Sequence, residues 1–235
     1  MGPGGYLLLE GGAEFGGSMA LPDTEALAAA GGPAAPVVII PAAAAPDRNH
    51  ERAGQNGVRW FQSLGAERVE ALPLIDRHSA DKPAIVAKLR RARMVYLLGG
   101  FPGHLAESLR DSTAWQAILA AYRAGAVIAG SSAGAMVLCE HFFDPVEDIV
   151  KPGLGLLDRI VIIPHHETFG RQWAPRLREA LPASLLVGID EKTGALGRGV
   201  DHPWQVFGRG RVTLQAGERR LSRGPGETFR IGDGR

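Results

Sequence analysis

The chain has 235 residues, of which 45% are hydrophobic and 22% are charged, and its formal net charge at pH 7 is +1. This composition is ordinary for a globular domain with a proper hydrophobic core, and the near-zero charge argues against a nucleic-acid-binding protein. We see neither a secretory signal pattern nor an apolar run of about 18 residues that would cross a membrane, so we expect a cytoplasmic protein. The single cysteine, Cys139, excludes an intrachain disulfide and a cysteine metal cluster and predicts a buried structural thiol.

Short apolar runs alternate with longer amphipathic stretches over the first part of the chain. The apolar runs predict strands over 6–9, 37–40, 69–74, 94–98 and 126–129. The stretches between them predict helices over 24–30, 49–64 and 83–92, one or two helices over 105–124, and a further helix over 133–140. This alternation predicts an α/β fold, a three-layer sandwich with a mainly parallel, doubly wound sheet.

The pattern changes after about residue 155. Two apolar runs predict strands over 160–163 and 185–189. Short alternating runs broken by glycine and proline then follow, over 204–207, 211–214 and 227–231. They predict a small antiparallel C-terminal β extension over 194–235, within a single α/β domain that covers residues 1–235.

Three glycine-rich turns each follow a predicted strand: Gly11-Gly12, Gly99-Gly100 and the segment from Gly130 to Gly134. The carboxyl ends of parallel strands meet at one edge of a sheet, where ligands bind. We therefore expect the three turns to surround one crevice.

The third turn reads Gly130-Ser131-Ser132-Ala133-Gly134, a G-x-S-x-G pattern between a predicted strand and a predicted helix. In a nucleophile elbow this pattern exposes a serine hydroxyl above the sheet, and the glycines let the strand and the helix approach closely. Ser132 is the candidate nucleophile, with the amides of Ala133 and Gly100 as candidate oxyanion donors. The plainer alternative is a glycine- and serine-rich turn that only caps a helix.

A serine nucleophile needs a base, usually a histidine that a carboxylate orients. Of the seven histidines, His165 and His166 directly follow a predicted strand. Glu191 and its neighbour Asp190 stand at the end of the next predicted strand. The residues alone leave both choices open. A metal site at His165-His166-Glu167 is disfavoured, because adjacent side chains on a strand point to opposite faces, and we expect no metal and no cofactor.

Taken together, these motifs resemble peptidase family S51, which includes cyanophycinases and aspartyl dipeptidases. The resemblance rests on segments 10–14, 99–100, 130–135, 153–157, 165–171 and 188–191. It implies a Ser132-His165-Glu191 triad with an oxyanion hole at Gly100 and Ala133, although a register slip of one residue would select His166 as the base.

One position pair departs from the family pattern. After the Gly99-Gly100 turn the family has Asn or Asp followed by a polar residue such as Gln, whereas this chain has Phe101 and Pro102. Phe101 would make this wall of the site apolar, and Pro102 lacks an N–H donor. Five residues are the candidate substrate contacts: Gly99, Phe101, Pro102, His166 and Arg171. We therefore expect a specificity changed from acidic dipeptides or cyanophycin.

The architecture also resembles class I glutamine amidotransferases, which carry a cysteine at the elbow. Ser132 in that place argues against the thiolate route. The sequence thus predicts a serine hydrolase, a peptidase acting on small peptides through an acyl-enzyme. The alternatives are a non-catalytic ligand-binding module and an amidase or acyl-transfer enzyme. We expect a small peptide or amide as substrate, no nucleic-acid or membrane partner, and a sequence compatible with a homodimer.

Overall fold

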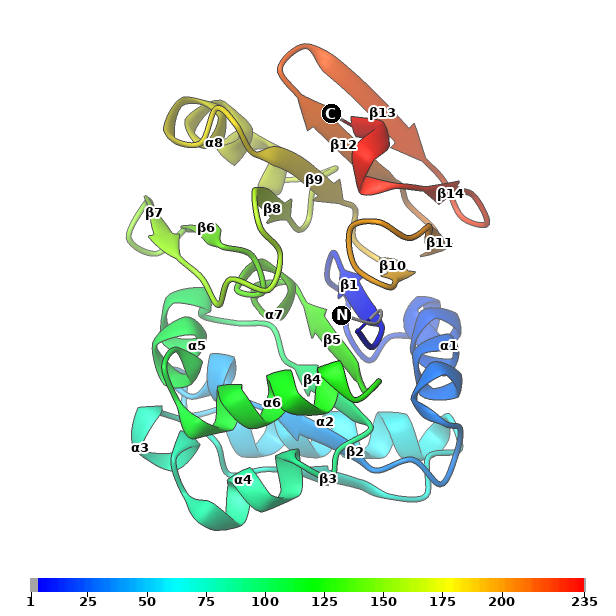
Figure 1. Cartoon of the computed structure of the whole chain (residues 1–235), viewed down its shortest axis with the longest axis vertical. Helices are drawn as coiled ribbons and strands as arrows, with labels where there is room; N and C mark the ends of the chain where they lie inside the picture. The colour runs from blue at the N-terminus through cyan, green and yellow to red at the C-terminus, as the bar shows by residue number, and fades with distance from the viewer. Residues whose placement is uncertain (1–3, 235) are drawn as a thin grey trace.

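The computed structural model describes residues 4–234 and contains an eight-stranded sheet (Figure 1). Its strands lie in the order β14 (Thr228–Phe229), β11 (Trp204–Gly208), β10 (Thr193–Gly197), β1 (Leu7–Glu10), β5 (Val127–Ser131), β4 (Met94–Leu97), β2 (Val37–Ile40) and β3 (Val69–Ala71). From β1 to β3 neighbouring strands are parallel, while β10, β11 and β14 extend the sheet in antiparallel fashion. The expected α/β class and the antiparallel extension are confirmed.

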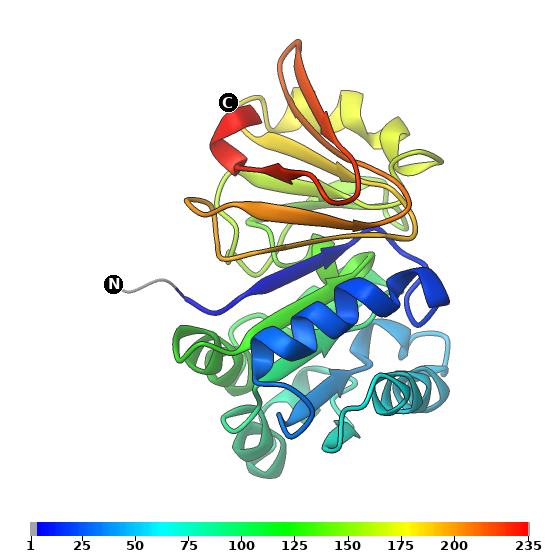
Figure 2. The ribbon, with the colours of Figure 1, turned by 90° about the vertical axis from the view of Figure 1, so that its right-hand side faces the viewer.

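Helices cover both faces of this sheet because successive strand side chains point in opposite directions. On β1, Leu8 packs into a core with α1 (Ala20–Ala30) and α2 (His50–Ser63). Its neighbours Leu7 and Leu9 pack into the core on the other face. That face is covered by α3 (Arg77–Ala80), α4 (Pro83–Leu89), α5 (Pro102–Leu109) and α6 (Thr113–Arg123). Figure 2 shows α1 in front of the sheet, running roughly along the direction of β1. Each buried leucine contributes on the order of 1.5–3 kcal/mol to folding.

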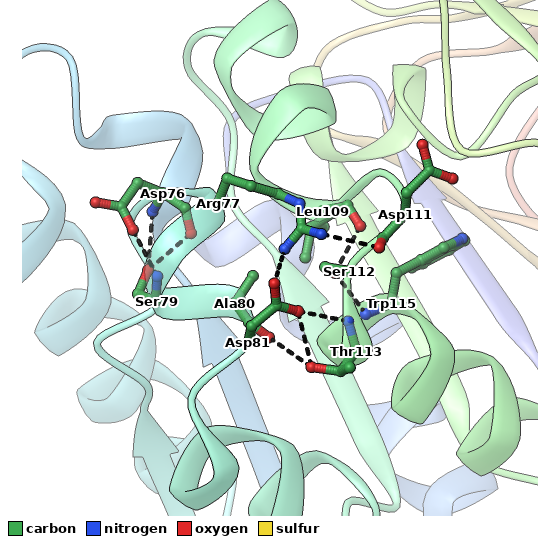
Figure 3. Close-up of polar contacts among 10 residues, drawn as sticks. All are labelled: Asp76, Arg77, Ser79, Ala80, Asp81, Leu109, Asp111, Ser112, Thr113 and Trp115. Atoms are coloured by element: carbon green, nitrogen blue, oxygen red, sulfur yellow. Dashed lines mark hydrogen bonds and ion pairs between the residues drawn. The ribbon is translucent and has the colours of Figure 1, made fainter.

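Side-chain hydrogen bonds connect the end of α3 with the start of α6, on the face of the sheet that α3 to α6 cover (Figure 3). Asp76 caps α3, and Ser112 Oγ accepts the backbone N–H of Trp115 at 2.9 Å at the start of α6. Asp81 Oδ1 accepts the N–H and the hydroxyl of Thr113, both at 2.8 Å. The N–H of Thr113 is the main reason that the pKa of Asp81 falls to about 2. These bonds satisfy N–H groups that a helix start leaves without partners.

A second sheet has four strands, in the order β13 (Arg219–Arg223), β12 (Val212–Ala216), β9 (Leu185–Ile189) and β8 (Ile160–Ile163). It lies at the top of Figure 1, where α8 (Ala174–Ala180) packs against it. The expected strands over 160–163 and 185–189 are confirmed as a parallel pair. The chain runs from β9 in this sheet to β10 and β11 in the larger sheet, then back to β12 and β13, and finally to β14.

The segment after Ser132 differs from the prediction. The helix expected over 133–140 is wrong, because α7 spans only Ala133–Met136. The chain returns at residues 154–157, whose amides bond to carbonyl oxygens of residues 137–139 and so end the helix. Cys139 is buried there beside Leu157, and burial raises the pKa of its thiol to about 12, as expected for a structural cysteine.

Several short elements have no counterpart in the sequence predictions. A hairpin of β6 (His141–Asp144) and β7 (Ile149–Pro152) follows α7. The described residues also include four 3₁₀ turns, η1 (Gly17–Met19), η2 (Ala42–Ala44), η3 (Gly170–Trp173) and η4 (Ile231–Gly234). Within residues 4–234, the helices all lack the length and apolar character that crossing a bilayer demands.

Candidate active site

Ser132 lies in the sharp turn between β5 and α7, with φ +48° and ψ −112°. A non-glycine residue with positive φ is strained, and such strain is typical of functional sites. The turn closes because Gly134 has no side chain: a Cβ there would lie 2.1 Å from the carbonyl oxygen of Leu97, at the end of β4. The geometry is that of a nucleophile elbow.

The Gly99-Gly100 turn lies directly beside this serine. A Cβ built on Gly99 would lie 3.3 Å from the Cβ of Ser132. Gly100 has φ +134°, and a Cβ there would come within 2.4 Å of the carbonyl oxygen of Ala43. Within residues 4–234, neither the N–H of Gly100 nor the N–H of Ala133 has an acceptor. One free amide directly follows the serine and the other lies in the turn beside it, so both are candidate donors to an oxyanion.

His165 links the serine to a carboxylate. Its Nε2 lies 3.0 Å from Ser132 Oγ, and its Nδ1 lies 2.8 Å from Glu191 Oε1. The side chains of His165 and Glu191 are 16% and 39% exposed, so both reach solvent. A Cβ on Gly12 would lie 2.4 Å from His165 Cε1, so the first glycine turn makes room for the imidazole. The three glycine turns do converge, as expected.

The triad residues come from two different sheets. Ser132 follows β5 of the larger sheet, whereas His165 and Glu191 follow β8 and β9 of the four-stranded sheet. A backbone hydrogen bond joins the two: the N–H of His165 donates to the carbonyl oxygen of Gly11, just after β1, at 2.9 Å. Within the larger sheet, the N–H of Gly11 in turn donates to the carbonyl oxygen of Thr193 in β10 at 3.0 Å. The residue that follows β1, the neighbour of β5, therefore holds the backbone of His165 beside the serine turn.

His166 and Asp190 form a separate pair beside the triad. His166 Nδ1 lies 3.6 Å from Asp190 Oδ1, and its ring packs over Gly188, where a Cβ would come within 2.3 Å. Asp190 Oδ2 accepts the N–H of Arg211 at 2.8 Å. Burial opposes the ionisation of Asp190, but the nearby His166 imidazole and the Arg211 amide outweigh it and lower the pKa. His165 and Glu191, and not their neighbours, are the residues that the structure brings to Ser132.

The other predicted substrate contacts lie on neighbouring elements, and none of them contacts Ser132, His165 or Glu191 through a hydrogen bond within residues 4–234. Phe101 is partly exposed at the edge of a cavity of about 190 Å³, and Pro102 begins α5. Arg171 is exposed on η3. Within residues 4–234 no group of three or more His, Cys, Asp or Glu side chains is placed to hold a metal ion.

Sequence reasoning missed two residues that touch the triad. The ring of Phe169 stacks on the His165 imidazole, with centroids 4.7 Å apart, and is 49% exposed. The Glu167 carboxylate accepts the backbone N–H of Glu191 at 2.9 and 3.0 Å. Both lie in the turn after His165, and nothing in the sequence pattern indicates which way their side chains point.

A buried acidic cluster, also missed, lies below the first glycine turn. Glu10 and Asp23 are fully buried; Glu10 accepts a hydrogen bond from Tyr96, and Asp23 Oδ2 accepts one from Trp60 at 2.7 Å. Burial, together with the neighbouring Asp23 carboxyl, raises the pKa of Glu10 well above its usual value. Burial likewise raises the pKa of Asp23 to about 7. The pair stays protonated at pH values where free carboxyls are ionised.

We expect Asp23→Asn to stabilise the protein at high pH. The unfolded chain releases the Asp23 proton near pH 4, whereas the fold holds it up to about pH 7. Stability therefore falls as pH rises between these values, by at most about 4 kcal/mol for a shift of three pKa units. Urea unfolding at pH 5 and pH 8 should show a smaller loss for Asp23→Asn, whose amide still accepts from Trp60. An equal loss in wild type and variant would contradict this account.

The sequence model of peptidase family S51 matches residues 7–196 of the chain. A cyanophycinase from Nostoc sp. (strain PCC 7120) is 32% identical over 198 residues, which cover 79% of this chain and 64% of the Nostoc protein. A cyanophycinase from Synechococcus elongatus is 30% identical over 198 residues, which cover 79% of this chain and 60% of that protein. The chain thus spans less than two thirds of the length of these relatives.

Two solved structures are also similar. The crystal structure of a peptidase from an acI-B1 Actinobacterium is 30% identical, covers 97% of both chains and superposes with a TM-score of 0.86. A Listeria monocytogenes EGD-e protein assigned as a peptidase E is 18% identical over 94% of this chain and 98% of its own, with a TM-score of 0.60, and shares the fold. From the extent of the family match and the identity to these relatives, the chain belongs to peptidase family S51.

Proposed function

We propose that the chain is a serine hydrolase that cleaves amide bonds of small peptides through an acyl-enzyme intermediate. The observation that carries the proposal is the unbroken path from Ser132 Oγ through both ring nitrogens of His165 to Glu191, with steps of 3.0 and 2.8 Å. Separations of about 2.6–3.2 Å between nucleophile, base and orienting group are those of a working triad.

In the proposed reaction His165 Nε2 takes the Ser132 proton as Oγ attacks the substrate carbonyl carbon. Glu191 accepts the Nδ1–H bond, which selects the tautomer and stabilises the imidazolium. The amides of Gly100 and Ala133 donate to the oxyanion, each worth about 3–4 kcal/mol. His165 then gives its proton to the leaving amine, and a water repeats the sequence to release the acid and free Ser132.

The proposed substrate preference follows from the side chains near the serine turn and the imidazole. The related proteins carry the name cyanophycinase, but Phe101 and Pro102 stand where the family resemblance leads one to expect polar side chains. Phe101 and Phe169 are both partly exposed near the turn and the imidazole. These two partly exposed rings favour a peptide with an apolar group beside the scissile bond over an acidic one.

Labelling with a fluorophosphonate, located by mass spectrometry, tests this function. Wild type should label at Ser132, and Ser132→Ala should not label. A panel of dipeptides and simple amides, with acidic and apolar residues at each position, then separates a peptidase from an amidase. If the folded wild-type protein reacts with neither probe nor panel, the hydrolase proposal fails and a ligand-binding role for the crevice replaces it.

A further inference from the structure

The turn after β4 contains three consecutive backbone N–H groups that differ in their hydrogen-bond acceptors. The N–H of Gly99 donates to Glu14 Oε2 at 3.0 Å, and the N–H of Phe101 donates to the carbonyl oxygen of Ala43 at 2.9 Å. The N–H of Gly100 between them has no acceptor within residues 4–234. The two flanking amides are thus held, and the free one is the candidate oxyanion donor.

Glu14 reaches this turn from the loop between β1 and η1, and the loop is shaped to present it. The residues on either side, Ala13 and Phe15, have φ values of +56° and +61°, which non-glycine residues adopt only under strain. The Phe15 ring packs against Trp60 and Tyr96, with centroids 6.5 and 5.4 Å apart. Two strained residues and a packed aromatic ring therefore fix the direction in which the Glu14 carboxylate points.

The carboxylate itself is partly buried, at the edge of a cavity of about 520 Å³ that Asn49, Asn56 and Arg59 also line. Burial raises the pKa of Glu14, and the hydrogen bond from Gly99 lowers it in part. Keeping a desolvated carboxyl in this place costs folding free energy. The Glu14 carboxylate contacts the turn beside Ser132: its Oε2 lies 3.3 Å from the position that a Cβ on Gly99 would occupy.

We propose that Glu14 is a positioning residue for the oxyanion hole. Two consecutive glycines leave a peptide plane free to rotate, since glycine adopts positive and negative φ about equally well. The bond from Gly99 to Glu14 holds the Leu98–Gly99 peptide plane, and the bond from Phe101 to Ala43 holds the Gly100–Phe101 plane, so the Gly99–Gly100 plane between them is fixed at both ends. Together they leave the Gly100 N–H directed at the oxyanion. This inference rests on the proposed hydrolase function.

The geometry separates the acceptor role of Glu14 from its charge. Glu14→Gln keeps an oxygen for the Gly99 N–H and loses the charge, whereas Glu14→Ala loses both. Asp23→Asn is the matched control, because it replaces a neighbouring buried carboxyl that makes no hydrogen bond with the turn.

The experiment measures the second-order rate constant of Ser132 labelling by a fluorophosphonate, whose phosphoryl oxygen needs the same donors. Glu14→Ala should label about 10²-fold more slowly, the cost of losing or misplacing one donor. Glu14→Gln and Asp23→Asn should stay within about threefold of wild type. Hydrogen exchange of a peptide spanning residues 98–101 should speed up in Glu14→Ala alone, while exchange over residues 130–136 stays unchanged.

The outcomes distinguish the two proposals. A folded wild-type protein that does not label at Ser132 overturns the hydrolase function and this role of Glu14 with it. A wild type that labels, with Glu14→Ala labelling equally fast, overturns the role of Glu14 alone. An equal loss in Glu14→Gln and Glu14→Ala also overturns it, because charge and not the hydrogen bond to Gly99 would then be what matters. Unchanged exchange at residues 98–101 in Glu14→Ala would have the same meaning.

Discussion

Replacing His165 with alanine should lower the rate of hydrolysis, and of fluorophosphonate labelling at Ser132, by a factor on the order of 10⁴ or more. The imidazole Nε2 is the only nitrogen base within residues 4–234 that hydrogen-bonds Ser132 Oγ, at 3.0 Å. Without it the hydroxyl keeps its proton at neutral pH and is a poor nucleophile. The rate constants of purified variants, compared with wild type at one pH, measure the effect.

His166→Ala is the matched control for this experiment, since the two histidines are adjacent in sequence. The His166 ring packs over Gly188 and lies beside Asp190, away from Ser132. We expect His166→Ala to keep activity within about tenfold, with some loss of stability from the space it leaves. If His166→Ala were as inactive as His165→Ala while still folded, the assignment of the base would be wrong.

Glu191→Gln should slow the same reactions by about 10³- to 10⁴-fold, the loss expected when a triad carboxylate becomes an amide. The amide has no charge to stabilise the imidazolium, and its NH₂ group can donate to Nδ1 and so select the wrong tautomer. The measurement is kcat on the best peptide of the panel, because the effect belongs to the chemical step and KM should change little.

Asp190→Asn provides the control at the neighbouring position. Its Oδ2 holds the Arg211 amide and its Oδ1 faces His166, so the loss should fall on stability and leave kcat within about tenfold. A fully active Glu191→Gln enzyme together with an inactive Asp190→Asn enzyme would assign the third triad position to Asp190 instead.

The strands and the elbow were predictable because their signals are local. Val37–Ile40 and Ile160–Ile163 are β-branched runs of a kind that helices disfavour, and both are strands with the predicted bounds. The elbow was predictable because its glycines allow the close approach of strand and helix that the turn requires. The end of α7, by contrast, depends on residues 154–157 returning to bond with residues 137–139, which no local pattern reveals.

The position of the site was predictable because the carboxyl ends of neighbouring parallel strands lie close together. Placing His165 and Glu191 after strands correctly brought them near Ser132, but the sequence did not show that these strands belong to a second sheet. The choice between His165 and His166 depends on the backbone conformation directly after β8, with φ +48° at His165, which the strand pattern does not reveal. Glu14 and Glu167 act through hydrogen bonds to backbone amides of distant residues, and such contacts leave no spacing rule in the sequence.

The crossing of the chain between the two sheets has a consequence for biosynthesis. By the end of β10 all three triad residues have been made, yet β9 still lacks β12, with which it pairs over four residues from Val212↔Ile189 to Gln215↔Leu186. β10 likewise lacks β11, its neighbour on the side away from β1. A nascent chain that stops before residue 204 therefore carries the reactive groups without the strands that hold them in place. In this architecture Ser132, His165 and Glu191 are held in their final arrangement only after β11 and β12 have been made.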